Sequence, residues 1–338
     1  MASPRVDPAD WHVPTLDEVF DLAAAYPGGP IFLDTKLPPG EDEVARRMGE
    51  QYLAAFTRQP ALRGRAFIAC PDAGQLAVMQ EVFAADPAFA DFRDFALDHE
   101  ELSGFVLGHD VDEATPLRGA GDNRWLSIGA AYKPLAVGGF DDLLTLVGRT
   151  LERTRRPGGV HAGKRLCVWT IDDEAQMEAL ARLAPDVILT NLPDRLHAVL
   201  DRHFGRRGAD PARPLVMCHR GGPDGHGRPE NTLPLLELGL TTGDAIELDV
   251  CSATDGAVVL HDNDPEGAVT VLRRAGGGVG EFKPVYRGPR ALADRRMDQL
   301  TVAEIQASHG YARDEKGALA SVATGLRAVA QLVKDAID

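Results

Sequence analysis

Residues 244–262, DAIELDVCSATDGAVVLHD, contain the pattern that decides the fold. The apolar run 244–250 has the length and composition of a buried strand, and a second run, GAVVLHD (256–262), follows after only five residues. A parallel crossover needs a dozen or more residues, and Thr254-Asp255-Gly256 is a turn signal. We therefore expect the second run to return beside the first as an antiparallel hairpin strand.

Similar apolar runs occur along the whole chain and alternate with longer amphipathic stretches, which is typical of β/α units around a parallel sheet. Besides 244–250, the expected strands are 30–36, 65–72, 103–110, 124–130, 164–173, 186–191 and 214–222. Expected helices include 40–59 and 172–184, the second beginning at Asp172 or Asp173 as N-cap. Eight parallel strands close a barrel, so the sequence predicts a (β/α)8 TIM barrel.

Three segments do not fit this alternation. Residues 205–213 are rich in Gly, Pro and Arg and are typical of a linker between two halves. Residues 263–299 contain a triple glycine and little periodicity, which indicates an irregular insertion. The stretch 317–338 has helical spacing of apolar residues. We expect one barrel domain that spans the 338 residues, ending in a C-terminal helix.

The composition limits the classes of function. A formal net charge of -15 argues against general nucleic-acid binding, and requires any site for an anion to build a local positive field. No apolar run is long enough to span a bilayer, and the N-terminus lacks the features of a signal peptide, so we expect a cytoplasmic protein. The spacing of the four cysteines fits no zinc pattern, which predicts buried free thiols.

Candidate metal ligands lie on two of the expected strands. Glu247 and Asp249 alternate along one strand, as Asp34 and Lys36 do along another, so each pair shares a face. Three carboxylates without a thiolate form a hard oxygen site, which suits Mg²⁺ or Ca²⁺, or else Mn²⁺, better than Zn²⁺. Together with Lys36 and Arg220, such a metal would bind and neutralise a phosphate group.

Two histidines complete the candidate site. His219 follows the apolar part of the expected strand 214–222. His261 lies in the hairpin, which brings it towards the same rim of the barrel. Barrel enzymes carry their sites at the C-terminal ends of the strands. In the cleavage of a phosphodiester, one imidazole would accept a proton from the attacking oxygen, and the other would donate a proton to the leaving alkoxide. The residues leave open which histidine has which role.

The arrangement of these motifs resembles the glycerophosphodiester phosphodiesterase family. The segments HRGGPDGHGRPENT (219–232) and IELDVCSATDGAVVLHD (246–262) contain the elements HRG, PENT, ELDV, a Thr and Asp-Gly turn, and HD in the family's order. The segments around FLDTK (32–36), VWTIDD (168–173) and DVILTNLPD (186–194) resemble the rest of the family. The resemblance implies metal-dependent hydrolysis of a small-molecule glycerophosphodiester to glycerol 3-phosphate and an alcohol such as choline or ethanolamine.

The two halves of the chain occur in the opposite order from the family. Residues 1–204 match the family's C-terminal half and 214–316 its N-terminal half, while 300–311 would ordinarily lead into the segment here written 14–19. Joining the two termini restores one complete barrel, so we interpret the order as a circular permutation. A fragment cut from two tandem domains, or a homodimer with intertwined halves, would give the same sequence.

Two departures bear on the substrate. The family usually has Glu where this chain has Asp34, and the related spider-toxin-like phospholipases D have Asp-x-Lys there, which favours a lysophospholipase D or cyclising reaction as an alternative. After His261-Asp262 the family's Leu-x-Arg-Thr-Thr run is replaced by residues 263–266, NDPE. That region helps to cover the site in the family, so a specialised phosphodiester is a further alternative. A non-catalytic binding or scaffold barrel is the alternative from another class.

Several residues have a structural interpretation beside the functional one. The resemblance places Trp169 beside the glycerol or head group, although it would serve equally as a core aromatic. Lys36 is expected either to bind phosphate or to pair with Asp34 or Glu247. Glu230 and Asn231 lie where a loop enters a helix, so this segment either shapes the site or caps the helix through Asn231 or Thr232.

Overall fold

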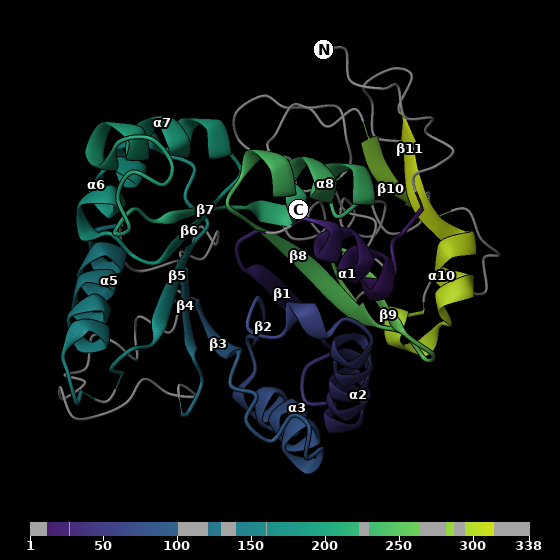
Figure 1. Cartoon of the computed structure of the whole chain (residues 1–338). Helices are drawn as coiled ribbons and strands as arrows, with labels where there is room; N and C mark the ends of the chain where they lie inside the picture. Colours follow the sequence, from purple (N-terminus) through teal and green to yellow (C-terminus); the bar gives the residue numbers. More distant parts are fainter. Residues whose placement is uncertain are drawn as a thin grey trace, which may run out of the picture.

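Eight parallel strands close into a barrel within the part of the chain that the computed structural model describes, residues 12–26, 28–100, 121–129, 140–159, 161–222, 230–263, 282–286 and 295–313. The strands are β1 (Ile31–Lys36), β2 (Ala66–Cys70), β3 (Phe95–Glu100), β4 (Trp125–Gly129), β5 (Arg165–Trp169), β6 (Val187–Thr190), β7 (Leu215–Cys218) and β8 (Ala245–Ser252). Each pairs with the next, and β1 pairs with β8 over six residues to close the ring (Figure 1). The prediction of a TIM barrel is confirmed.

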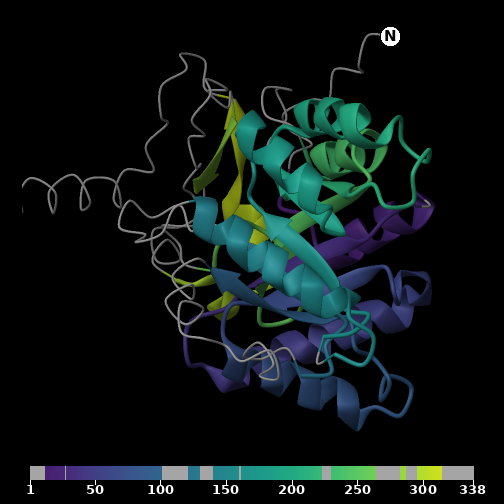
Figure 2. The same cartoon turned by 90° about the vertical axis from the view of Figure 1, so that its left-hand side faces the viewer.

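Helices cover the outside of the barrel (Figures 1 and 2). Those between barrel strands are α2 (Asp42–Arg58), α3 (Ala73–Ala85), α5 (Phe140–Arg155), α6 (Glu174–Leu183), α7 (Pro193–Phe204) and α8 (Leu233–Thr242). Helix α1 (Leu16–Ala25) precedes β1 and begins with a capping box, in which Thr15 Oγ1 accepts from Glu18 N at 3.2 Å and Glu18 Oε2 accepts from Thr15 N at 2.8 Å. Asp173 caps α6, as predicted.

The third barrel strand was predicted in the wrong place. It is β3, Phe95–Glu100, and the segment expected instead, 103–110, lies outside the described residues. Strand β3 pairs with β2 and with β4, where Asp98 aligns with Ser127. The segment FALDHE has only three apolar residues, and a similar run, FVL (105–107), follows a few residues later in the segment expected instead.

The hairpin after β8 is confirmed: β9 (Ala257–Val259) pairs antiparallel with β8. The insertion predicted to be irregular contains strand β10 (Phe282–Tyr286), which pairs with β11 (His309–Arg313) after helix α10 (Val302–Ser308). Two short 3-10 helices, η2 (Pro60–Leu62) and η6 (Met297–Gln299), lie in connecting segments. The expected C-terminal helix, 317–338, lies outside the described residues.

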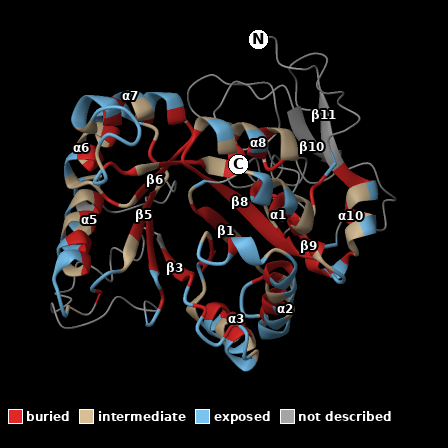
Figure 3. Cartoon of the chain, viewed as in Figure 1, coloured by how far each residue is buried: buried red, intermediate tan, exposed pale blue. Residues whose placement is uncertain are grey.

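Two apolar layers stabilise the barrel. Inside it, side chains of successive strands pack together, with Phe67 stacked on Trp125 at 4.2 Å between ring centroids. Outside it, the buried faces of the helices pack against the strands, so that most strand residues are buried while the outer helical surfaces are largely exposed (Figure 3). The four cysteines are free and buried, as predicted, and burial raises the pKa of Cys70 and of Cys218 to about 12.

The beginning and the end of the described chain lie side by side. Val13 O accepts a hydrogen bond from Gln306 Nε2 in α10 at 3.0 Å, and Pro14 O accepts from Val259 N of β9 at 2.7 Å. The segment 205–213, predicted to be a linker, connects α7 to β7. It is fastened to the start of β8, because Arg207 and Arg213 both pair with Asp244. None of the described helices combines the length and apolar character needed to cross a membrane.

Burial of His309 predicts a loss of stability in acid. Burial lowers the pKa of this imidazole from 6.5 to about 4, so the folded chain binds its proton less readily than the unfolded chain. The stabilising contribution is therefore complete above pH 6.5 and is lost as the pH falls towards 4. We expect His309→Gln to reduce by about 2 kcal/mol the drop in unfolding free energy between pH 7 and pH 5.

Urea unfolding at the two pH values measures this difference. His203→Gln, at an exposed histidine on α7 whose ion pair with Glu178 is screened by solvent, is the matched control and should change the drop much less than His309→Gln. An equal drop in His309→Gln and in the wild type would contradict the assignment.

Candidate active site

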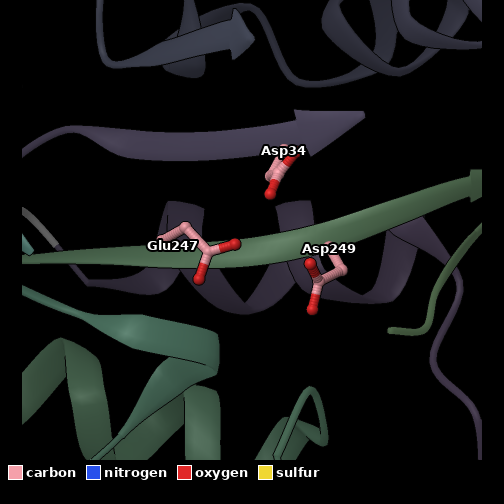
Figure 4. A group of neighbouring side chains, drawn as sticks. All are labelled: Asp34, Glu247 and Asp249. Atoms are coloured by element: carbon pink, nitrogen blue, oxygen red, sulfur yellow. The ribbon is translucent and has the colours of Figure 1, made fainter. Parts of the chain in front are cut away.

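Three carboxylates converge at the rim where β1 and β8 lie side by side (Figure 4). Asp34 is aligned with Asp249 across the two strands, and Glu247 lies two residues earlier on β8. Each of the three offers a ligand oxygen within 4.8 Å of the others. Glu247 and Asp249 are only 2% and 1% exposed. The alternation inferred from the sequence therefore brings these side chains together as predicted.

These carboxylates have the donor chemistry of a site for a hard divalent cation. Glu247 Oε1 is buried and has no hydrogen-bond donor among the described residues. Asp249 Oδ1 likewise accepts no hydrogen bond there, although Lys36 Nζ lies 3.2 Å away. Buried carboxylate oxygens without donors are costly unless a cation neutralises them. Oxygen ligands alone suit Mg²⁺, Ca²⁺ or Mn²⁺, so the residues fit the metal that the sequence predicts.

Two basic side chains lie against the carboxylates. Lys36 Nζ is 2.5 Å from Asp34 Oδ2, and Arg220 Nε is 3.0 Å from Asp249 Oδ2. Burial would raise the pKa of Asp249, but Arg220 and Lys36 outweigh it and hold this pKa well below its ordinary value. Burial and the charge of Asp249 raise the pKa of Glu247, so a proton and a metal ion would compete for that carboxylate.

The turn after β7 positions Arg220. Residues His219–Gly221 form the short helix η4, in which Arg220 has φ 53° and its backbone N–H donates to Glu247 Oε2 at 2.7 Å. Gly221 follows at φ 89°, and helix α8 packs so closely that a Cβ at Gly239 would lie 2.2 Å from the Gly221 carbonyl oxygen. Glycine at positions 221 and 239 therefore allows the backbone of this turn to pack directly against α8.

Glu230 and Asn231 shape the site, and neither one caps α8. Glu230 Oε1 accepts from Arg220 at 2.9 Å. Asn231 has φ 58° and holds Asp249 twice: its Nδ2 donates to Oδ2 at 2.8 Å and its Oδ1 accepts from the backbone N–H at 3.2 Å. The N-cap position of α8 is Thr232, whose side chain makes no capping hydrogen bond.

His219 is held in a defined orientation by Asn191 and Asp172. Its Nδ1 lies 2.7 Å from Asn191 Oδ1. The amide of Asn191 is oriented by Asp172, because Nδ2 donates to Oδ2 at 2.5 Å and the backbone N–H donates to Oδ1 at 2.8 Å. Since the Asn191 oxygen only accepts, Nδ1 of His219 must carry the proton in the neutral ring. Nε2, which lies 3.8 Å from Glu247 Oε2, is then the proton acceptor.

His261 approaches the carboxylates from the other side. It follows β9, and its Nδ1 lies 3.5 Å from Asp249 Oδ2. The backbone nearby is fixed by a hydrogen bond from Leu260 N to Asp249 O at 3.1 Å. The hairpin predicted from the sequence therefore carries this histidine to the rim, as expected.

Trp169 lies at the end of β5 on the inner wall, and its exposure is intermediate. Its Nε1 donates to Ser127 Oγ at 2.7 Å. A Cβ at Gly129 would lie only 2.2 Å from the indole ring, so only glycine fits beside it there. The indole is thus fixed between two residues of β4, neither of which the sequence identified.

Sequence reasoning also missed Asn191 and Asp172. Both occur in segments quoted for the family resemblance, VWTIDD and DVILTNLPD, but no spacing rule connects them to His219. Their relation depends on strands β5, β6 and β7 lying next to one another.

Comparisons with known proteins add little to these observations. No protein-family model matches the chain, and no curated protein matches it. Among solved structures, it is similar to that of a protein provisionally named as a glycerophosphoryl diester phosphodiesterase from Silicibacter pomeroyi DSS-3, with 20% identity and a TM-score of 0.38. The match covers 54% of this chain and 55% of that one, so the chain spans about half the length of the structure it matches. At that level the likeness carries no information on chemistry.

Proposed function

We propose that this protein is a metal-dependent phosphodiesterase that hydrolyses glycerophosphodiesters to glycerol 3-phosphate and an alcohol. The observation that carries the proposal is the convergence of three carboxylates, two basic side chains and two histidines at one rim of the barrel. This set provides what phosphodiester hydrolysis requires: charge neutralisation at the phosphate, a proton acceptor and a proton donor. The sequence resemblance supports the glycerol-containing substrate.

Asp34, Glu247 and Asp249 would hold the metal ion, which when bound supplies Lewis-acid neutralisation of the phosphate charge. Arg220 and Lys36 would bind the phosphate oxygens. Arg220 is suited to this role because Glu230 and Asp249 fix its guanidinium in place. Trp169 would line the pocket for the glycerol or head group.

The hydrogen bond to Asn191 supports a distinct role for each histidine. With the Nδ1 proton directed to Asn191 Oδ1, His219 would accept a proton at Nε2 from the attacking oxygen. The donor role then falls to His261. In its protonated ring Nδ1–H would face Asp249 and Nε2–H would be available to the leaving alkoxide.

Activity against glycerophosphocholine and bis(p-nitrophenyl) phosphate tests the proposal. We expect turnover that EDTA abolishes and that added Mg²⁺, Ca²⁺ or Mn²⁺ restores. His219→Ala and Glu247→Ala should each lose at least about a hundredfold in kcat, because general base and metal ligand are removed. His203→Ala, at the surface of α7, is the matched control and should retain full activity.

The same assay separates the alternatives. Exclusive turnover of lysophosphatidylcholine would favour a phospholipase D-like reaction, and so would a cyclic phosphate as the final product by ³¹P NMR. That reaction is the alternative suggested by Asp34, because the related phospholipases D also have Asp-x-Lys in this segment. A folded protein that neither binds metal nor turns over any of these substrates would contradict the enzymatic proposal and favour a binding or scaffold role.

The role of Asn191 can be measured at His219 itself. In Asn191→Ala the imidazole loses the acceptor that holds its Nδ1 proton, so we expect kcat to fall about tenfold or more with little change in KM. Histidine ¹⁵N NMR should show His219 Nε2 unprotonated in the wild type and a tautomer mixture in the variant. Asn123→Ala, at a buried asparagine ahead of β4, is the control and should keep the wild-type kcat and the wild-type tautomer of His219. A wild-type tautomer with the proton on Nε2 would reverse the proposed roles.

We also propose that the chain is circularly permuted and builds its site from one copy. Closure of the barrel between β1 and β8, and the contact of Val13 with Gln306, support this order. Asp34 and Glu247 come from opposite halves, so their inactive alanine variants can be mixed by co-refolding. A single-chain site predicts no recovery, whereas an intertwined dimer predicts about a quarter of wild-type activity, because half of the sites in mixed dimers are intact.

A further inference from the structure

Lys36 is placed differently from the other basic residue of the site. Its ammonium bridges two of the three candidate metal ligands, at 2.5 Å from Asp34 Oδ2 and 3.2 Å from Asp249 Oδ1. Its side chain is 26% exposed, so solvent screens these contacts only in part. Arg220 contacts the other oxygen of Asp249, Oδ2, and shares its charge with Glu230.

We propose that Lys36 is an internal counter-ion that competes with the divalent cation for Asp34 and Asp249, and thereby sets how tightly the protein binds its metal. The inference rests on the proposed function, because it concerns the same metal site. It goes beyond a phosphate-binding role, because it assigns Lys36 an effect on metal affinity in the absence of any phosphate.

The physical basis is repulsion between like charges at a shared site. The ligand oxygens lie within 4.8 Å of one another, so a cation that they hold lies within a few ångströms of an ammonium contacting two of them. At such a distance, and partly shielded from water, the repulsion is strong. The metal must therefore either bind against this charge or displace Lys36 from Asp34.

Displacement is feasible for lysine in a way that it is not for Arg220. The ammonium is a point charge on a flexible stem, and within the described part of the chain it contacts the carboxylates of Asp34 and Asp249. Arg220 is 5% exposed and is anchored through its guanidinium to Glu230 and Asp249 and through its backbone to Glu247. A phosphate group would offer the released ammonium a new partner, so metal and phosphate should favour each other's binding.

Isothermal titration calorimetry with Mn²⁺, in phosphate-free buffer at pH 8, tests the proposal. We expect Lys36→Met and Lys36→Gln to bind Mn²⁺ at least about tenfold more tightly than the wild type, because the competing charge is gone. Lys36→Arg keeps the charge and should bind Mn²⁺ no more tightly than the wild type. Lys164→Met removes a lysine that donates to the Gly121 and Asn123 carbonyls, far along the chain from Asp34, and is the matched control.

The outcomes separate this inference from the proposed function. Glu247→Gln should abolish Mn²⁺ binding in both the wild-type and the Lys36→Met background, which ties the signal to the site. If the wild type binds Mn²⁺ and both neutral variants bind it with the same or a lower affinity, the proposed role of Lys36 is overturned. The metal site itself would then stand. Failure of the wild type and of both variants to bind Mn²⁺ would overturn the metal site and this inference with it.

Discussion

Two carboxylates, Glu247 and Asp249, are buried on one face of β8, and much of the barrel rim is arranged around their charge. A buried carboxylate is tolerated only where cations or hydrogen-bond donors compensate it. Arg220 contributes its guanidinium to Asp249 and its backbone N–H to Glu247. Asn231 donates from Nδ2 to the Asp249 carboxylate and accepts from the Asp249 backbone N–H through Oδ1. The left-handed backbone at these two residues is the conformation that makes those contacts possible.

The same constraint organises the chemistry. Among the described residues no donor reaches Glu247 Oε1, which lies at the point where Asp34 also converges. The histidines approach this cluster from neighbouring strands, and one of them, His219, is oriented by Asn191. A barrel permits this arrangement because the ends of parallel strands meet at one rim wherever their residues fall in the sequence. The proposed reordering of the two halves would therefore leave the geometry of the rim unchanged.

Much of the fold and of the candidate site could be predicted from the sequence. Strand alternation is periodic, so it fixes which of Glu247, Leu248 and Asp249 share a face without knowledge of the rest of the chain. Strand β3 was misplaced because its apolar part, 95–97, is short and a similar apolar run, 105–107, follows a few residues later. Asn191 and Asn231 were missed or left undecided because their roles depend on contacts between strands and loops distant in sequence, for which no local pattern exists.

The central claim is that one chain brings Asp34 from its first half and Glu247 and Asp249 from its second half to a single metal ion. Anomalous X-ray diffraction from crystals soaked in Mn²⁺ tests it most directly. A metal site built within one chain predicts one strong anomalous peak per chain, within about 2.5 Å of oxygens of all three residues of the same copy. A peak shared between Asp34 of one copy and Glu247 of another, or no peak at this rim, would contradict it.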